Sequence, residues 1–482
     1  MSTEAISPHV FIRDFTRELH AQNAAVFAGA GLSMASGYVD WKGLLEELVR
    51  DLHLDPELET DLVSVAQYHC NQAGGKNALT TRILQHFSQT REPTENHRIL
   101  AQLPIETYWT TNYDKLIETA LVEAKKVPDV KYTVLHLAVT KPGRDVVVYK
   151  MHGDVDHPTE AIISKEDYES YHHTHSPFVS ALRGDLIQKT FVFLGFSFSD
   201  PNLDYILSRV SGLYRQHQRN HFSIQKRVSQ LVDETSDAFE YRKLKQHYFI
   251  KDLKRFGIQT VLVDEYRDIT TLLKAVSSAY KRTSVFISGA AHDFGPWGRA
   301  CAETFLHDLS YQLLKDGNRV VTGFGLGVGS PVINGSLAFL NDNAKTVSDR
   351  NVVMRPFPQV STGGGNLADQ WKNYRIGILE YAGVAVFVFG NKDDGKGNVI
   401  PSNGMRQEFD LAVQAGLIPL PVGATGFMAE EIWKEVSADL KKFVPAARKE
   451  FEDDFARLGD KSLSPADLLG AISNLIKHVQ RN

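Results

Sequence analysis

The chain has 482 residues, of which 43% are hydrophobic and 23% are charged. This length exceeds what one hydrophobic core usually supports and predicts two or three domains, and the composition excludes a disordered or fibrous protein. The 53 Lys and Arg residues against 58 Asp and Glu residues give a formal net charge of −5, which argues against a broad basic surface for nucleic acid.

The chain contains two cysteines, Cys70 and Cys301, which excludes a disulfide framework and a zinc site of four thiolates within one chain. The N-terminal residues include acids and no long apolar run, and no stretch reaches the ~18 apolar residues of a membrane helix. We therefore expect a cytoplasmic protein that has no membrane partner and binds no metal.

In chain order, apolar residues at helical spacing between residues 8 and 22 predict a helix, and a short strand follows over 24–28. Further apolar or β-branched runs each end in a polar or glycine-bearing loop, with helix-like stretches between them: 107–110, 146–149, 191–194 and 260–263. This alternation predicts a mostly parallel sheet covered by helices, with ligands at the carboxyl ends of the strands.

An amphipathic helix over 268–282 predicts a boundary near residue 283, giving domains 1–283 and 284–482. A second α/β series follows, with strands at 284–287, 319–322, 352–355 and 384–389, and helices at 299–314, 367–381, 429–443 and 465–479. The segments 360–367 and 391–404 have no periodicity, and we expect functional or mobile loops there.

The first motif that could carry chemistry follows the strand over 24–28 and is Ala28-Gly29-Ala30-Gly31-Leu32-Ser33. Glycine lets a backbone approach a phosphate closely, and free N–H groups at a helix start attract anions. The alternative is a tight strand-to-helix turn without a ligand, since Gly-x-Gly is common.

Asn112 and Asp114 form the second motif, directly after the strand over 107–110. Side chains two positions apart point to one side of an extended backbone, so an amide and a carboxylate there could hold a ribose or a carboxamide. An Asx turn or a helix N-cap is the alternative.

His152 follows the strand over 146–149, within Lys150-Met151-His152-Gly153-Asp154. With 18 histidines in the chain, a single one is more often structural than catalytic. At the carboxyl end of a strand, before a glycine that opens space, it is placed as a general base for a sugar hydroxyl or a water.

These three motifs, together with a fourth at 194–202, resemble the Sir2 (sirtuin) family in their order along the chain. The resemblance implies a Rossmann-like domain whose Gly-Ala-Gly-x-Ser loop holds the pyrophosphate of NAD. It also implies that Asn-x-Asp contacts the nicotinamide ribose and carboxamide, that the histidine is the base, and that a Gly-x-Ser loop lines the adenosine side. The implied NAD-binding residues are Ala28, Gly29, Ala30, Gly31, Ser33, Asp114, Gly195 and Ser197, and the implied catalytic residues are His152 and Asn112.

Two departures from the sirtuin pattern argue against deacylation. There is no Cys-x-x-Cys for a zinc ribbon, and the family's Gly-Ile-Pro-Asp-Phe-Arg stretch is Gly-Tyr-Val-Asp-Trp-Lys at 37–42. Water could then attack the activated nicotinamide–ribose bond, which predicts an NAD glycohydrolase with NAD as substrate and no true cofactor. The alternatives are a non-catalytic NAD-binding sensor and, with less support, an NAD-dependent protein deacylase.

The second half resembles the SLOG family, Rossmann-like nucleotide sensors related to lysine-decarboxylase-like phosphoribohydrolases. Glycine-bearing runs follow its first and second strands, which suits close backbone contact with a phosphate-bearing ligand. The Pro-Gly-Gly-x-Gly-Thr signature of the enzymes is missing, and residues 362–366 are only Thr-Gly-Gly-Gly-Asn. We therefore expect this domain to bind a nucleotide without turning it over. Arg375 and Lys392 would bond a pyrophosphate and Glu408 would accept from ribose hydroxyls, although without the family both cations would be simple surface charges. The candidate effector-binding residues are Ser288, Gly289, Gly325, Gly327, Gly329, Arg375, Lys392 and Glu408.

A Sir2 domain without a zinc ribbon, followed by a SLOG domain, is similar to the effectors of the bacterial Thoeris anti-phage system. This resemblance implies that a partner TIR-domain protein, ThsB, makes a cyclic ADP-ribose isomer, which the SLOG domain binds as an activator. The Sir2 domain would then deplete cellular NAD and cause abortive infection. A homo-oligomer, a tetramer or a higher assembly, is also implied, whereas the preferred isomer and the stoichiometry stay open.

Overall fold

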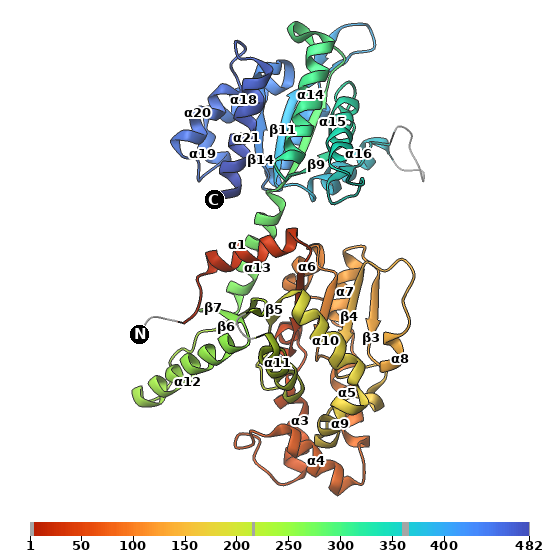
Figure 1. The fold of residues 1–482 in the computed structure, drawn as a ribbon, viewed down its shortest axis with the longest axis vertical. Helices are drawn as coiled ribbons and strands as arrows, with labels where there is room; N and C mark the ends of the chain where they lie inside the picture. The colour runs from red at the N-terminus through yellow and green to blue at the C-terminus, as the bar shows by residue number, and fades with distance from the viewer. Residues whose placement is uncertain (1–3, 215–216, 359–365, 482) are drawn as a thin grey trace. The chain divides into compact units, whose positions relative to one another are not determined.

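The structure, a computed structural model, describes residues 4–214, 217–358 and 366–481 (Figure 1). The chain forms two compact units, Met1–Ser277 and Ser278–Asn482, and the division falls within helix α13 (Arg267–Lys281). Among the described residues, no helix combines the length and the apolar character needed to cross a membrane.

The first unit contains a seven-stranded parallel sheet in the order β3-β4-β2-β1-β5-β6-β7. The predicted parallel α/β architecture is therefore confirmed, and β3 and β6 are strands that the sequence patterns did not reveal. The strands are β1 (Ala24–Ala28), β2 (Thr107–Thr110), β3 (Pro128–Lys131), β4 (Val146–Lys150), β5 (Thr190–Leu194), β6 (His221–Lys226) and β7 (Ile258–Val263).

Alternating side chains of β1 enter two separate apolar layers, as the two-residue repeat of a strand requires. Ala25 and Phe27 belong to a cluster that includes Trp109 and Phe193 of the neighbouring strands. Val26, on the opposite face, adjoins Tyr108. Because all five residues of β1 are buried, the strand is a short, continuous apolar run at the centre of the sheet.

Helices cover this sheet, and α9, α10 and α11 supply many side chains of the apolar cluster that contains Phe27 and Phe193. A separate apolar cluster joins α3, α4 and α5 to the loops that follow β2 and β4. The other helices of the unit complete the layers (Figure 1). The helices are α1 (Pro8–His20), α2 (Ala30–Ser33), α3 (Trp41–Asp51), α4 (Leu62–Ala73), α5 (Asn77–Phe87), α6 (Glu95–Gln102), α7 (Leu116–Glu123), α8 (Val134–Leu137), α9 (Lys165–Thr174), α10 (Ser176–Gln188), α11 (Pro201–Tyr214) and α12 (Ser236–Arg255).

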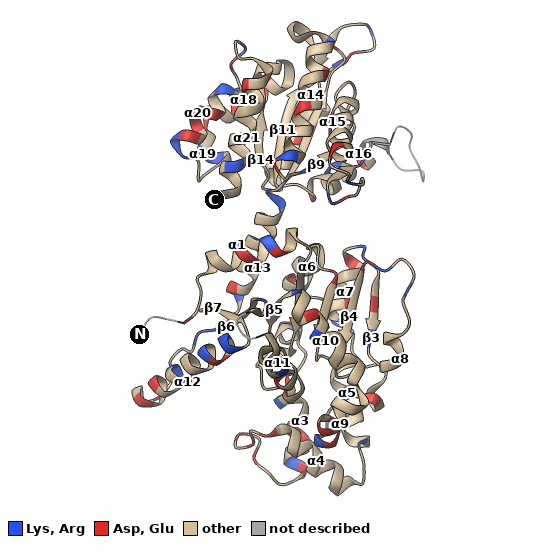
Figure 2. Cartoon of the chain, in the orientation of Figure 1, with Lys and Arg blue, Asp and Glu red and all other residues tan. Residues whose placement is uncertain are grey.

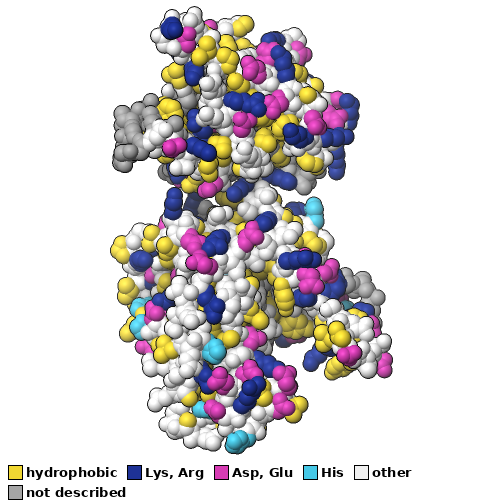
Figure 3. Space-filling view, turned by 180° about the vertical axis from the view of Figure 1, so that it is seen from behind, with side chains coloured by type: hydrophobic (Ala, Val, Ile, Leu, Met, Phe, Trp, Pro, Cys, Tyr) yellow, Lys and Arg dark blue, Asp and Glu magenta, His cyan; other side chains and the backbone are white. Residues whose placement is uncertain are grey.

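Helix α12 is largely exposed and buries Ile250 and Leu253 near its C-terminal end. Tyr241 and Tyr248 are 66% and 60% exposed on the same helix. Charges of both signs lie along it (Figure 2). On the face of the molecule shown in Figure 3, basic and acidic side chains are likewise interspersed over both units. The described residues of that face therefore form no extended basic surface of the kind that binds nucleic acid.

The second unit contains a five-stranded parallel sheet in the order β10-β9-β8-β11-β14. Its strands are β8 (Ser284–Ala290), β9 (Arg319–Thr322), β10 (Val352–Met354), β11 (Val384–Phe389) and β14 (Ile418–Pro421). One continuous apolar core joins this sheet to the surrounding helices. The helices are α14 (Gly298–Lys315), α15 (Gly329–Asp342), α16 (Leu367–Leu379), α17 (Asn403–Gln414), α18 (Phe427–Ala438), α19 (Leu440–Phe443), α20 (Lys449–Arg457) and α21 (Pro465–Arg481).

Two expectations for the second unit were wrong. The segment 391–404 is not a structureless loop, because β12 (Asn391–Asp393) and β13 (Val399–Pro401) pair as an antiparallel hairpin and α17 begins at Asn403. The single helix predicted over 429–443 is broken at Asp439, whose side chain accepts a hydrogen bond from Lys442 N and caps α19. Most of the other unpatterned segment, residues 360–365 of 360–367, lies outside the described residues.

Candidate active site

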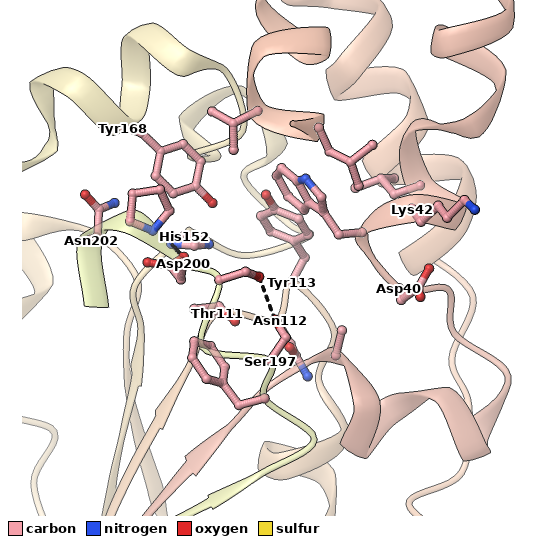
Figure 4. Close-up of a pocket in the computed structure, with 18 of the residues that line it drawn as sticks. Asp40, Lys42, Thr111, Asn112, Tyr113, His152, Tyr168, Ser197, Asp200 and Asn202 are labelled. Atoms are coloured by element: carbon pink, nitrogen blue, oxygen red, sulfur yellow. Dashed lines mark hydrogen bonds and ion pairs between the residues drawn. The ribbon is translucent and has the colours of Figure 1, made fainter. Parts of the chain in front are cut away.

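A cavity of about 820 Å³ lies at the carboxyl ends of β1, β2, β4 and β5 (Figure 4). This edge of a parallel sheet is where ligands bind in doubly wound folds. All four sequence motifs contribute to its lining, through Ala30, Gly31, Ser33, Asn112, Asp114, His152, Gly195 and Ser197. Of the candidate substrate-binding residues, Ala28 and Gly29 do not line it, since Ala28 is the last residue of β1 and Gly29 is the N-cap of α2.

The first glycine motif packs directly against the loop that follows β5. Gly29 N donates to Leu194 O and Gly31 N donates to Gly195 O, each at 2.9 Å. A side chain at Gly29 would come within 2.5 Å of Gly195 O, so the two loops can approach this closely only without a Cβ. The amide groups of both glycines are thus used to join the loops, and neither is free for an anion.

Replacing Gly195 with alanine should disrupt this contact. Gly195 has a φ of +61°, which disfavours a side chain, and its Cβ would also overlap Leu32 N. We expect the free energy of unfolding of the first unit to fall by roughly 2–4 kcal/mol. Chemical denaturation measures this, with Gly184→Ala as the control.

Gly184 lies inside α10, and no atom stands within 4 Å of an added Cβ, so alanine there should leave stability unchanged or raise it by up to about 1 kcal/mol. If Gly195→Ala were as stable as Gly184→Ala, the glycine would not be needed for the loop packing.

Asn112 links the second motif to the first. Its Nδ2 donates at 3.0 Å to Gly29 O and at 3.0 Å to the Ser33 hydroxyl. An amide has two N–H groups, so both are used, and the Oδ1 atom is left as an acceptor at the cavity wall. The Asn112 amide N in turn donates to Thr110 Oγ1, which fixes the start of this turn.

Asp114 is 4% exposed and lines the same cavity. Its Oδ1 accepts from Leu116 N at 3.0 Å, in the Asx turn that the sequence offered as an alternative. Its Oδ2 is buried and has no hydrogen-bond partner among the described residues. A buried carboxylate oxygen without a donor costs free energy, and a ligand with an N–H or O–H group would remove that cost.

The imidazole of His152 is 3% exposed and lies between Asp200 and the aromatic side chains of α9 (Figure 4). Its Nε2 atom is 3.1 Å from Asp200 Oδ2. The rings of Tyr168 and Tyr171 meet the imidazole edge to face, with centroids at 5.3 and 6.5 Å. Burial raises the pKa of both tyrosines well above the ordinary value, so they are neutral hydrogen-bonding groups near neutral pH.

Lys150, the last residue of β4, is fully buried. Its Nζ donates to Asp114 O and to Asp154 Oδ2, both at 2.5 Å, and lies 3.1 Å from Glu118 Oε1. Burial would lower the pKa of Lys150, but the carboxylates of Glu118, Asp154 and Asp114 outweigh burial and raise it to about 12. A single permanent cation thus joins the Asn112–Asp114 turn to the turn that carries His152.

Sequence reasoning missed Asp200, Asn202, Tyr168 and Lys150 as parts of this site. Asn202, on α11, is 7% exposed and lines the cavity with an Nδ2 that has no partner among the described residues. The signal was present, since Asp-Pro-Asn lies in the loop after β5 at the start of α11, but this combination usually indicates only a helix start. Among the described residues, no group of His, Cys, Asp and Glu side chains is arranged to hold a metal ion.

In the second unit, three of the eight candidate effector residues form one buried group. Ser288 donates to Glu408 Oε2 at 2.6 Å, and Arg375 Nε lies 3.5 Å from Glu408 Oε1, at ion-pair distance. That Nε has no hydrogen-bond partner among the described residues, and the guanidinium also lies over the ring of Phe357. Burial raises the pKa of Glu408 in spite of both partners.

The glycines of this unit serve close backbone packing. A Cβ on Gly289 would touch Val328 and Val388, and one on Gly325 would overlap Gly289 O. Gly327, with a φ of +71°, lies against Ala291 O, and Gly329 begins α15. Lys392 lies in β12 and makes no hydrogen bond or ion pair with the Ser288–Glu408–Arg375 group in the described structure. Residues 362–365 of the glycine run lie outside the described residues.

The comparisons with known proteins cover both units. Residues 106–253 match the SIR2-like domain family, and residues 268–479 match the Sir2- and TIR-associating SLOG family. The protein named NAD(+) hydrolase ThsA from Bacillus cereus (strain MSX-D12) is 46% identical, over 97% of this chain and 98% of its own length. The chain belongs to the ThsA family.

Two further ThsA proteins support this assignment. That of Acinetobacter baumannii (strain 532279) is 43% identical over 97% of this chain and 98% of its own length. That of Enterococcus faecium is 38% identical over 98% of this chain and 97% of its own length. Both carry the name NAD(+) hydrolase. These ThsA relatives match the chain almost from end to end, so each match spans both units.

Proposed function

We propose that this chain is an NAD⁺ glycohydrolase that releases nicotinamide, an effector of bacterial anti-phage defence. The observation that carries the proposal is the meeting of His152 and Asn112 in one cavity with two unpartnered buried groups, Asp114 Oδ2 and Asn202 Nδ2. Such groups indicate a polar ligand in a site of this kind. Membership of a family named for NAD(+) hydrolysis supports the same reaction.

In this reaction the bond between C1′ of the ribose and the nicotinamide nitrogen breaks, and its electron pair leaves with neutral nicotinamide. The oxygen of a water molecule forms the new bond to C1′, and the proton of that water passes to the imidazole of His152. The products are nicotinamide, ADP-ribose and a proton. The cavity supplies position and electrostatic stabilisation for a sugar centre that becomes positively charged.

Asn112 and Asp114 have separate tasks in this mechanism. The two N–H groups of Asn112 hold Gly29 and Ser33, so its Oδ1 accepts from the attacking water or from a ribose hydroxyl. The free Oδ2 of Asp114 accepts from the carboxamide N–H of the nicotinamide. The loops that carry Ser33, Gly195 and Ser197 contact the rest of the dinucleotide, and NAD is therefore substrate and not cofactor.

The experiment that separates this function from its alternatives uses the full-length protein with NAD and a panel of cyclic ADP-ribose isomers, with and without an acetyl-lysine peptide. A hydrolase releases nicotinamide without the peptide, and equal amounts of ADP-ribose appear. A deacylase releases nicotinamide only with the peptide. A sensor binds NAD in a calorimetric titration and yields no product. Either of the last two results would overturn the proposal.

We also propose that the second unit binds a cyclic ADP-ribose isomer and thereby activates the first. The match of residues 268–479 to a Sir2- and TIR-associating SLOG family supports a nucleotide signal linked to a TIR-domain protein. Arg375 Nε makes no hydrogen bond among the described residues and is a donor suited to a pyrophosphate, and the Ser288–Glu408 pair offers an acceptor for ribose hydroxyls. Lys392 is a second cation for the same ligand.

Arg375→Ala should weaken this activation. A charge-assisted hydrogen bond contributes about 1.5–3 kcal/mol, so the concentration of cyclic ADP-ribose isomer that gives half-maximal nicotinamide release should rise roughly 10-fold to 150-fold. Arg406→Ala is the control, because Arg406 lies in α17 and pairs with Glu435 and Asp410. An unchanged activation curve for Arg375→Ala, alongside an unchanged Arg406→Ala, would remove Arg375 from the effector site.

The partners that we propose are a TIR-domain protein, ThsB, acting through the diffusible nucleotide, and further copies of this chain. NAD loss in an infected cell would then end in abortive infection. The exposed Tyr241, Leu244 and Tyr248 of α12 offer an apolar strip for a homo-oligomer, whether a tetramer or a higher assembly. Light scattering with and without the cyclic nucleotide measures the stoichiometry.

A further inference from the structure

We propose that Asp200 is a positioning residue for the hydrolysis, holding the imidazole of His152 so that Nε2 carries a proton and Nδ1 is the base. This inference rests on the proposed function. It assigns a role to a residue that the sequence pattern placed only in a loop along the adenosine side. The fourth motif would thus belong to the reacting centre as well as to the binding of the dinucleotide.

The geometry at the ring supports this orientation. Nε2 lies 3.1 Å from Asp200 Oδ2, and the two side chains are 3% and 8% exposed. The contact with Asp200 is at ion-pair distance, and Nε2 is buried with no hydrogen-bond partner among the described residues. No hydrogen bond to Nδ1 is present in the described structure either. A carboxylate accepts and cannot donate when ionised, so the nitrogen that faces it is the one that carries hydrogen. The lone pair is then on Nδ1.

The carboxylate of Asp200 is itself fixed and ionised. Its Oδ1 accepts from Leu203 N at 2.9 Å, at the start of α11. Burial would raise the pKa of Asp200, but His152 and the amides of Leu203 and Asn202 outweigh burial, and the pKa is lowered. An anion therefore stands against the ring before the reaction and stabilises the imidazolium that forms when water gives up its proton.

Among the titratable groups around the His152 imidazole, Asp200 is the charged partner of the ring. Tyr168 and Tyr171 of α9 are neutral, as described above. His175, between α9 and α10, has its pKa lowered by burial and by His152. Asp114 and Glu169 line the same cavity and have no ion pair with the ring in the described structure. On the strand that precedes His152, Lys150 is occupied by Asp154 and Glu118.

Asp200 also caps α11, so its effect on the fold has to be separated from its effect on the histidine. Asp200→Asn keeps the size and the cap, because asparagine is as good an N-cap as aspartate. It removes the charge, and it allows an amide N–H to point at Nε2, which would reverse the position of the ring proton. Asp185→Asn is the matched control, since Asp185 is a partly buried aspartate of the same unit that accepts from Trp109 Nε1.

The experiment measures kcat and KM for NAD with the full-length protein and saturating effector, across the pH range in which histidine titrates. For Asp200→Asn we expect kcat to fall about 10²-fold to 10⁴-fold with little change in KM. The acid limb of kcat/KM should move to lower pH, because the imidazolium loses its anion. Asp185→Asn should keep the wild-type profile.

A purely structural role predicts a different pattern, namely Asp200→Asn with the wild-type kcat and an unmoved acid limb, and that result would overturn the inference. If Asp200→Asn failed to fold, Asp200→Ser, which also caps a helix and carries no charge, would serve for the same comparison. If the wild-type protein released no nicotinamide, the proposed function itself would fail. The two failures are therefore distinguishable.

Discussion

His152→Ala is expected to lower nicotinamide release about 10²-fold to 10⁴-fold, the usual contribution of a positioned general base. The reason lies in its surroundings, because the neighbouring tyrosines are neutral near neutral pH and cannot take over a proton. Steady-state kinetics with the effector present measures the change. The binding of NAD, followed by calorimetry, should be weakened far less than the turnover.

The exposed His157, which hydrogen-bonds to the hydroxyl of Tyr132, provides the control for this substitution. His157→Ala should keep full turnover. Wild-type rates in His152→Ala would show that another group accepts the proton, and the mechanism assigned to this cavity would then be wrong.

Asn112→Ala should have an effect on turnover of the same size, about 10²-fold to 10⁴-fold, for a different reason. The change removes the acceptor for the attacking water and also both hydrogen bonds that join the two motifs, to Gly29 O and to Ser33. The acceptors left behind are buried, so the free energy of unfolding should also fall by about 1–3 kcal/mol. Kinetics and chemical denaturation measure the two effects separately.

Asn112→Asp tests the hydrogen-bond directions at this position. A carboxylate has no N–H for Gly29 O and would place a negative charge against that carbonyl, so this variant should be as inactive as Asn112→Ala and less stable. Ser33→Ala, which removes one of the two acceptors, should lose less than either. Full turnover in both Asn112 variants would exclude Asn112 from the reaction.

Much of the fold could be predicted from the sequence because its strands are short apolar runs that end in distinctive loops. The strands at 24–28, 107–110 and 384–389 lie where the pattern placed them. β3 and β6 were missed, since Pro128–Lys131 and His221–Lys226 contain several polar or charged residues. The break at Asp439 was also missed, because apolar periodicity continues through it while the capping side chain starts a new helix.

The order of the motifs along the chain predicted which loops form the candidate site. It did not predict the contacts between the residues of the site. The loops after β1 and β5 pack so closely that a Cβ would clash at Gly29, Gly31 and Gly195. The sequence does not show that these two loops are in contact. Asp200 lies 48 positions after His152, and no local pattern relates the two. In the second unit, Arg375 and Glu408 were predicted as separate ligand contacts, whereas the structure places them as a buried pair.

The central claim is that the Asn112–His152 cavity hydrolyses NAD when the second unit has bound its nucleotide. The most direct measurement follows NAD, nicotinamide and ADP-ribose together in one reaction of the purified full-length protein, with a panel of cyclic ADP-ribose isomers. At least one isomer should increase turnover, and the amounts of NAD lost, nicotinamide gained and ADP-ribose gained should be equal. Undiminished NAD with every isomer, under conditions where the protein binds NAD, would contradict it.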